Sequence, residues 1–314
     1  MKDCVDNTFT IQTKTIACTG LVSCPRNISI FIGENLKIKF EPPNIILVNG
    51  VVVSVPYSGN GVSIGSHGNH IYFSCGLGFR IKWDGHSSVY VTVEKTKMNK
   101  LCGLCGTYDN QPSNDLMTSS NNVVTSAAAF GNSWKANEYG ETCPDIADQP
   151  SACQPNSSLL TTANQICSKI YSDAFKVCHP LVATQDYFQW CLEDVCSCNT
   201  TNASLCACSS LTEYSRKCVH LGARDLSWRT SDFCPKQCSS GKIYKECASM
   251  CPLTCVRRAS NSSQCNSDCY DGCECPPNKV LHNDDCIDVA SCPCVHNKLN
   301  YMPGAVLQQD CNNW

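Results

Sequence analysis

The fold of the first part of the chain is indicated most clearly by one segment, Ile45-Ile46-Leu47-Val48-Asn49-Gly50-Val51-Val52-Val53. Two apolar runs rich in β-branched residues flank an Asn-Gly pair. The two turn positions of a tight hairpin need positive φ, which Asn and Gly tolerate best. Asp84-Gly85 repeats this signal between Phe79–Trp83 and Val89–Val93. We therefore predict a β-hairpin at each place.

The β pattern extends over residues 8–95. Apolar side chains occupy every second position of residues 28–32 and again of residues 36–40. A period of two places one face of a strand in a core and the other in solvent. Several short strands joined by tight turns are typical of packed antiparallel sheets, so we predict a mainly β protein that begins with an antiparallel β-sandwich.

The cysteines divide the chain into two kinds of structure. Of 29 cysteines in 314 residues, six lie in residues 1–142 and the other 23 in residues 143–314. The first part can therefore build an ordinary hydrophobic core, whereas the second depends on covalent cross-links. Because the number is odd, at least one cysteine is unpaired or pairs outside this segment.

Composition also indicates the compartment. Cysteine at about 9% of residues is typical of a disulfide scaffold in an oxidising environment; the alternative is a zinc protein of the cytosol. Charged residues make up 16% and the formal net charge is −3, which argues against nucleic acid as a partner. No apolar run of about 18 residues is present, so we predict no membrane insertion.

Secretion agrees with five Asn-x-Ser/Thr sequons, which predict N-glycosylation at Asn27, Asn156, Asn199, Asn202 and Asn261. No apolar segment typical of a signal peptide follows Met1. The chain stops at Trp314, shortly after a cysteine. We therefore expect a piece of a longer secreted, extracellular glycoprotein.

Helical periodicity replaces the strand pattern in residues 159–222. In residues 159–178 the apolar residues near helical spacing are Ile166, Ile170, Ala174 and Val177. A second helix is predicted around residues 187–195, and a third around residues 211–218, ended by Gly222. Residues 238–292 have a cysteine every few positions, which predicts short strands and loops around disulfides.

Residues 61–65 match the G-x-S-x-G pattern of a hydrolase nucleophile. That chemistry needs Ser63 on a strand-to-helix turn, with a histidine partner and an oxyanion hole. The following residues, through Phe73, have a strand pattern instead, so a glycine-flanked hairpin is the better interpretation. The seven histidines are scattered. We predict no catalytic residues and no enzyme activity.

Cys102-Gly103-Leu104-Cys105 is a C-x-x-C motif. Such a pair exchanges disulfides when a thiolate is stabilised by nearby positive charge, and Lys97 and Lys100 are near in sequence. In a chain with 29 cysteines, a structural role is the stronger interpretation of Cys102 and Cys105.

The loop that follows, Thr107–Asp115, is rich in oxygen donors. Asp109, Asn114 and Asp115 offer carboxylate and amide oxygens and Gln111 a carbonyl, which are the ligands that calcium prefers. The spacing is not that of an EF-hand. On composition alone, a solvated turn explains the loop equally well.

Two groups of motifs resemble a known family. Leu101–Asp109, Asn114-Asp115-Leu116 and Phe130–Lys135 are similar to the end of a von Willebrand factor type D domain. The residues Glu193–Cys198, Cys206-Ala207-Cys208, Trp228-Arg229-Thr230 and Cys234-Pro235 resemble the eight-cysteine module that follows it.

The last part of the chain extends the resemblance. Ten cysteines fit a trypsin-inhibitor-like module: Cys238, Cys247, Cys251, Cys255, Cys265, Cys269, Cys273, Cys275, Cys286 and Cys292. In this combination of modules the chain resembles the gel-forming mucins and von Willebrand factor. The resemblance implies a type D domain without its start in residues 1–142, a helical eight-cysteine module in 150–234, a trypsin-inhibitor-like module in 238–292 and the start of a cysteine-rich extension in 293–314.

The resemblance implies a structural part of a secreted polymer of mucus or matrix, whose partners are other copies or other D assemblies of the same polymer. It also implies calcium binding by Asp109, the main chain of Gln111, Asn114 and Asp115. Thr107 stands where the family often has Asn or Asp, and the family's opening Gly-Asp-Pro-His segment is absent before Met1. Fewer charged ligands predict weaker binding.

Family members that cross-link chains through this assembly tend to carry an extra cysteine beside the Cys-x-Cys. Here Ser209-Ser210-Leu211 follows Cys208, so we predict no interchain bond from this module. One alternative is serine protease inhibition through the gap Cys265–Cys269, although its three small polar residues offer no anchor for a specificity pocket. The other is an adhesion protein of the tectorin or zonadhesin kind, which shares these modules.

Overall fold

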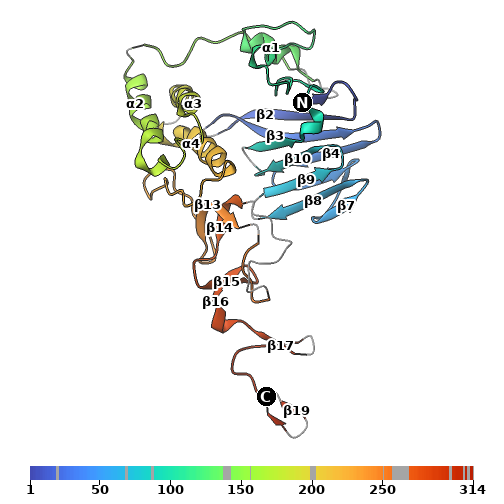
Figure 1. The fold of residues 1–314 in the computed structure, drawn as a ribbon, viewed down its shortest axis with the longest axis vertical. Coiled ribbons are helices and arrows are strands. Elements are labelled where there is room, and N and C mark those ends of the chain that lie inside the picture. The colour runs from blue at the N-terminus through green and yellow to red at the C-terminus, as the bar shows by residue number, and fades with distance from the viewer. Residues whose placement is uncertain are drawn as a thin grey trace. The chain divides into compact units, whose positions relative to one another are not determined.

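The computed structural model describes residues 1–18, 21–67, 70–85, 88–136, 143–155, 157–198, 203–249, 251–256, 269–296, 299–306, 308–309 and 312–313 (Figure 1). The chain divides into two compact units, residues 1–154 with 197–200 and residues 155–196 with 201–314. Each unit is described by itself below.

Two antiparallel sheets form most of the first unit. In order of hydrogen-bonded neighbours, the seven-stranded sheet contains β12 (Leu101–Cys102), β1 (Lys2–Asp3), β2 (Phe9–Cys18), β3 (Leu21–Ile32), β4 (Leu36–Glu41), β5 (Ile45–Val48) and β6 (Val51–Val52). The five-stranded sheet contains β11 (Val89–Val93), β10 (Phe79–Trp83), β9 (His70–Cys75), β8 (Val62–His67) and β7 (Tyr57–Gly59).

The two sheets share one apolar core, as the alternating pattern predicted. Ile30 and Phe40 come from the seven-stranded sheet and Phe73 and Trp83 from the other, and each is at most 1% exposed. The Phe40 ring stacks on Trp83 with centroids 6.0 Å apart and meets Phe73 edge-on at 6.4 Å. The prediction of a mainly β chain that begins with an antiparallel sandwich is confirmed.

Both predicted hairpins are present. Asn49 and Gly50 have φ of 50° and 82° and connect β5 to β6, so both turn positions use the left-handed region. Asp84 begins the second connection, where its carboxylate accepts a hydrogen bond of 2.9 Å from the backbone N–H of Ser88. Residues 61–65 enter β8, and β9 pairs with it, so this segment is a hairpin rather than a strand-to-helix turn.

Short helices complete the first unit: η1 (Lys95–Lys97), η2 (Pro112–Asn114) and α1 (Ala127–Ser133). Ser126 caps α1 by accepting a hydrogen bond from the N–H of Ala129. Trp134 follows the helix and donates its indole N–H to the carbonyl of Met117 at 3.0 Å. This hydrogen bond attaches the end of α1 to the segment around Met117, which follows the loop after β12.

The second unit begins with a helical module. Its elements are α2 (Ser158–Cys167), η3 (Ser168–Tyr171), η4 (Asp173–Phe175), α3 (Thr184–Cys196) and α4 (Ala203–His220). Gly222, at φ 105°, ends α4 as predicted.

The prediction of one helical pattern over residues 159–178 is wrong beyond Cys167. A continuous α-helix turns 100° per residue, which would aim Phe175 well away from the face of Ala163 and Ile170. The 3-10 turns η3 and η4 instead bring Phe175 into the core, where its ring lies 5.4 Å from that of Tyr214. Ala174 and Val177, which the helical spacing placed inside, are exposed.

Short antiparallel pairs form the remaining part of the chain, as predicted. They are β13 (Ile243–Ser249) with β14 (Cys269–Glu274), β15 (Lys279–His282) with β16 (Asp285–Asp288), β17 (Cys294–His296) with β18 (Leu299–Tyr301), and β19 (Gln308–Gln309) with β20 (Asn312–Asn313). One 3-10 turn, η5 (Val289–Ser291), follows β16.

Sulfur pairs connect these elements. The described disulfides are Cys4–Cys102, Cys167–Cys191, Cys178–Cys218, Cys208–Cys234, Cys238–Cys273, Cys247–Cys269, Cys255–Cys292 and Cys275–Cys286. Sulfur bonded to sulfur supports the disulfide interpretation over the zinc alternative. Among the described residues, no helix has the length and apolar character that a membrane span requires.

Candidate functional site

The loop after β12 is shaped by left-handed backbone positions. Gly106, Tyr108 and Asn110 have φ of 78°, 55° and 64°, so every second residue here bends the chain sharply. The Tyr108 side chain packs against the core of the sandwich. Asp109 lies between two of these bends, and η2 begins after Gln111. These bends therefore keep the predicted ligands together in one compact loop.

A hydrogen-bond network joins all four predicted ligands and Thr107. The two carboxylate oxygens of Asp109 accept hydrogen bonds from the backbone N–H of Gln111 at 2.8 Å and from the amide of Asn114 at 2.7 Å. Thr107 donates its hydroxyl to Asn114 Oδ1 at 2.9 Å and its N–H to Asp115 Oδ1 at 3.3 Å. The structure thus brings together the residues that the sequence singled out.

The network favours a charged Asp109. The hydrogen bond from the Asn114 side chain, with a smaller contribution from the Gln111 N–H, lowers the pKa of the Asp109 carboxyl below its ordinary value. Hydrogen bonds that favour the ionised form have this effect on a carboxyl group. A fixed negative charge in an exposed loop is one requirement of a cation site.

Gly106 positions the second carboxylate. A Cβ atom at this glycine would lie 2.2 Å from Asp115 Oδ1, so the close approach of Asp115 to the backbone requires glycine. Asp115, Thr107 and Gly106 line one side of a cavity of about 220 Å³, which Trp134 and Lys2 also border. Asp115 therefore faces a space that solvent or a small ion can fill.

The donor chemistry fits a hard cation in part. Two carboxylates, an amide oxygen and a main-chain carbonyl are available, and a carboxylate that accepts one hydrogen bond at each oxygen keeps further lone pairs. Among the described residues, however, there is no group of three or more His, Cys, Asp or Glu side chains that could hold a metal ion. Any cation here would be bound by two charges and neutral oxygens.

The C-x-x-C motif does not form an internal disulfide. Cys102 is bonded to Cys4, which ties the start of the chain to β12. Cys105 is exposed and is not in a disulfide, like Cys75, Cys143 and Cys294. The structure assigns Cys102 a structural role and leaves Cys105 as a thiol at the surface.

The sequence patterns did not predict an ion pair between Asp3 of β1 and Lys97. Asp3 is fully buried, and its carboxylate accepts hydrogen bonds from the Lys97 ammonium at 2.7 Å and from the backbone N–H of Asp6 at 3.0 Å. Burial raises the pKa of Asp3, but the hydrogen bonds from Lys97, Thr8 and Asp6 outweigh it and lower the pKa to about 2. Residues 94 positions apart give no local signal of such a pair.

The remaining predicted sites are mostly beyond what the structure describes. Asn27 lies half-buried in β3, opposite Lys14 of β2. Asn156, Asn199, Asn202 and Asn261 fall outside the described residues, as does the whole gap between Cys265 and Cys269.

Family models match three successive parts of the chain. The von Willebrand factor type D domain matches residues 1–122, the C8 domain residues 166–235, and the trypsin-inhibitor-like cysteine-rich domain residues 234–292. The chain therefore contains these three modules, in the order that the resemblance predicted.

Curated relatives cover nearly the whole chain. SCO-spondin of Gallus gallus is 33% identical over 97% of this chain, mucin-5AC of Homo sapiens is 34% identical over 85%, and von Willebrand factor of Bos taurus is 31% identical over 91%. The predicted similarity to mucins and von Willebrand factor is confirmed, and SCO-spondin joins them. The chain spans 6% of the length of that SCO-spondin, 5% of that mucin and 30% of that von Willebrand factor.

Proposed function

We propose that residues 1–314 are a structural, non-enzymatic segment of a secreted polymeric glycoprotein, in which they organise the packing of the polymer. The observation that carries the proposal is the uninterrupted order of a type D domain, a C8 module and a trypsin-inhibitor-like (TIL) module, which relatives named as mucins and von Willebrand factor share. The partners are other copies, or other D assemblies, of the same polymer.

The test removes the segment from the longer protein. The full-length polypeptide is expressed in mammalian cells with and without residues 1–314, and secreted polymers are compared by non-reducing gel electrophoresis and electron microscopy. We expect the deletion to yield secreted protein whose assemblies are smaller or disordered, and reinsertion to restore them. Polymers of unchanged size and order after deletion would contradict the proposal.

We further propose that calcium stabilises the D domain through Asp109, the Gln111 carbonyl, Asn114 and Asp115. The hydrogen-bond network that collects these residues and the lowered pKa of Asp109 support the site. When bound, calcium would supply positive charge to the carboxylates of Asp109 and Asp115. Because a ligand that binds only the folded state stabilises it, the D domain should unfold at higher temperature with calcium.

Calorimetry of the full chain tests the calcium site. We expect added calcium to raise the unfolding temperature of the D domain by a few degrees, roughly the effect of 1 kcal/mol in a domain of this size. Asp109→Asn and Asp115→Asn should each abolish the shift, while Asp285→Asn, an exposed carboxylate in β16, should keep it. Equal shifts in all four proteins would place the calcium elsewhere.

The segment itself is proposed to supply no interchain disulfide from the C8 module. Cys208 is bonded within the chain to Cys234, and Ser209 and Ser210 follow it. Protein harvested with its thiols blocked should migrate as a monomer on non-reducing gels. Bridged dimers that disappear on reduction would contradict this.

A further inference from the structure

The TIL module presents two buried carboxylates to the C8 module, from neighbouring strands. Glu246 lies in β13 and is 6% exposed, and Asp271 lies in β14, with a side chain 7% exposed. The pairing of these strands shifts register between Lys245 and Ala248. Such a bulge re-aims side chains, and Glu246 sits within it. Both carboxylates point at residues of C8.

The C8 module supplies two guanidinium groups and a hydroxyl to these carboxylates. Arg229 Nε donates to Glu246 Oε1 at 2.6 Å, and Ser215 of α4, which is fully buried, donates to Glu246 Oε2 at 2.8 Å. Arg216, also of α4, donates to Asp271 Oδ2 at 2.7 Å. In these two pairs the cations come from C8 and the anions from TIL, and Arg216 also pairs with Glu213 of its own helix at 2.8 Å.

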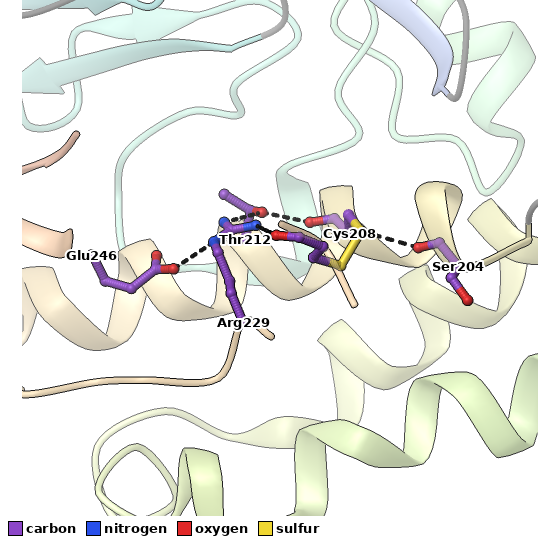
Figure 2. The surroundings of a disulfide bond; sticks show 6 residues. Ser204, Cys208, Thr212, Arg229 and Glu246 are labelled. Atoms are coloured by element: carbon purple, nitrogen blue, oxygen red, sulfur yellow. Dashed lines mark hydrogen bonds and ion pairs between the residues drawn. A yellow bond between two sulfur atoms is a disulfide. The ribbon is translucent and has the colours of Figure 1, made fainter. Parts of the chain in front are cut away.

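Arg229 is held on the C8 side by two further hydrogen bonds. Its Nη2 donates to the hydroxyl of Thr212 in α4 at 2.8 Å, and its Nη1 donates to the carbonyl of Cys234 at 3.1 Å. Figure 2 shows Arg229 between Glu246 and Thr212, with Cys208 on the same side as Thr212. The guanidinium therefore uses all three of its nitrogens.

Aromatic rings cover the same guanidinium. Its central carbon lies 4.0 Å from the ring centroid of Trp228 in C8 and 5.3 Å from that of Tyr244 in TIL. These contacts exclude water from the ion pair, which strengthens it and raises the cost of losing either partner.

A disulfide fixes the position of Arg229. Cys208 of α4 is bonded to Cys234, whose carbonyl accepts one of the Arg229 hydrogen bonds. The Thr212 hydroxyl, which accepts another, donates in turn to the carbonyl of Cys208. The bond therefore ties the segment that carries Arg229 to the helix on which the TIL strands dock.

We propose that C8 and TIL act as one rigid, cooperative unit, locked by the Arg229–Glu246 pair and dependent on the Cys208–Cys234 disulfide. The junction between the two modules then transmits tension without a hinge, and the TIL module is not an independently folding domain of this chain. This inference rests on the contacts above and holds whether or not the proposed polymer function is correct.

Hydrogen exchange of the full chain tests the lock. In Glu246→Gln and in Arg229→Gln, we expect exchange to speed up by about tenfold or more both in β13–β14 and in α4, because each substitution leaves a buried charge unpaired. The unfolding temperature of the unit should fall by about 10 °C. Asp284→Asn serves as the control, because it removes an exposed carboxylate of the same module that pairs with Lys242.

The double substitution and a mild variant complete the test. Arg229→Gln with Glu246→Gln should cost clearly less than the sum of the single variants, since neither charge is then left alone. If the single variants are not secreted, Ser215→Ala removes one hydrogen bond to Glu246 and should give the same coupled change at smaller size. Faster exchange confined to β13–β14, with α4 unchanged, or additive effects, would overturn the proposal.

The proposed role of the Cys208–Cys234 disulfide can be tested against a second disulfide of the same unit. Replacing Cys208 and Cys234 by Ala should accelerate exchange in β13–β14, although neither residue lies in these strands. Replacing Cys275 and Cys286, whose disulfide joins the residue after β14 to β16, should affect α4 less than the loss of Cys208–Cys234 does. Unaltered β13–β14 exchange after loss of Cys208–Cys234 would show that Arg229 is positioned without it.

Discussion

The D domain and the C8 module build their interiors from different materials. In the D domain, side chains such as Ile30, Phe40 and Trp83 from two sheets fill one apolar core. The described cystine of that domain, Cys4–Cys102, joins the start of the chain to a short edge strand. In the C8 module, the sulfur atoms themselves lie inside, since Cys167, Cys178, Cys191 and Cys218 are all 0% exposed.

The difference follows from how much apolar surface each part can bury. Two sheets present a wide face with an apolar residue at every second position, and burial alone stabilises such a layer. Three short helices with interrupted apolar stripes bury less, so cross-links that restrict the unfolded chain supply the rest. The contact between C8 and TIL is stabilised in a third way, by buried ion pairs that aromatic rings shield from water.

Reduction should separate the two parts most clearly. With excess dithiothreitol, residues 158–292 should lose most of their protection from hydrogen exchange, because each disulfide removed costs about 2–5 kcal/mol and several are lost together. Peptides from β3, β4, β9 and β10 should stay protected. Simultaneous loss of protection in both parts would mean that the D domain also depends on its cystine.

A cavity in the sandwich should have the converse effect. Phe40→Ala removes a fully buried ring and should lower the free energy of unfolding of the D domain by about 3–5 kcal/mol, measured by urea dependence of exchange in β3 and β4. Val52→Ala, at a residue 66% exposed, should change it by less than about 0.5 kcal/mol. Exchange in α3 and α4 should be unaffected, and a large change there would refute the separation of the cores.

The Asp3–Lys97 pair predicts an acid dependence that belongs to the D domain. Because its folded-state pKa of about 2 lies below the ordinary value of 3.8, ionised Asp3 stabilises the fold above about pH 4. The contribution, about 2 kcal/mol, is lost as the pH falls from about 4 to about 2. Asp3→Asn should destabilise the domain at neutral pH and flatten this dependence.

Exchange in β2 and β3, measured at several pH values, checks the acid dependence. Asp145→Asn removes an exposed carboxylate that pairs with Lys135 and should retain the full pH profile. An Asp3→Asn protein with the same steep loss of stability below about pH 4 would assign the effect to another group.

The smallest predicted effect concerns the β5–β6 hairpin, whose turn is Asn49-Gly50. Gly50 has φ of 82°, and a Cβ atom added there would have no other atom within 4 Å, so Gly50→Ala meets strain but no clash. We expect a loss of about 1–2 kcal/mol in the stability of the D domain, with the register of β5 and β6 preserved. Asn49→Gly should be nearly neutral. A shifted register in exchange or NMR data would mean that the turn specifies the pairing more strongly than the core does.

Local sequence patterns predicted the strands correctly but failed for part of one helical segment. The alternation in residues 28–40 and the Asn-Gly and Asp-Gly turns predicted the strands and hairpins correctly, because side-chain direction in a strand depends only on adjacent residues. The helical spacing of residues 159–178 correctly predicted that Ile170 is buried, but it wrongly predicted the same for Ala174 and Val177. There, the need to bury Phe175 and Cys178 against α4 outweighed local helix formation.

The candidate calcium loop was found from its composition, and its assembly was decided by folding. Asp109, Asn114 and Asp115 are close in sequence and polar, which made them visible as a group. Their mutual arrangement depends on left-handed positions at Gly106, Tyr108 and Asn110, and nothing in the sequence indicates that Tyr108 adopts this conformation.

The periodicities, the turns, the module order and the reliance on cystine could all be predicted from the sequence, because each depends on neighbouring residues or on composition. Which charges are buried together depends on tertiary packing. Asp3 meets Lys97, and Arg229 meets Glu246, across separations that no local pattern encodes. A buried charge is tolerated only beside its partner, and that partner is chosen by the way the strands and helices pack.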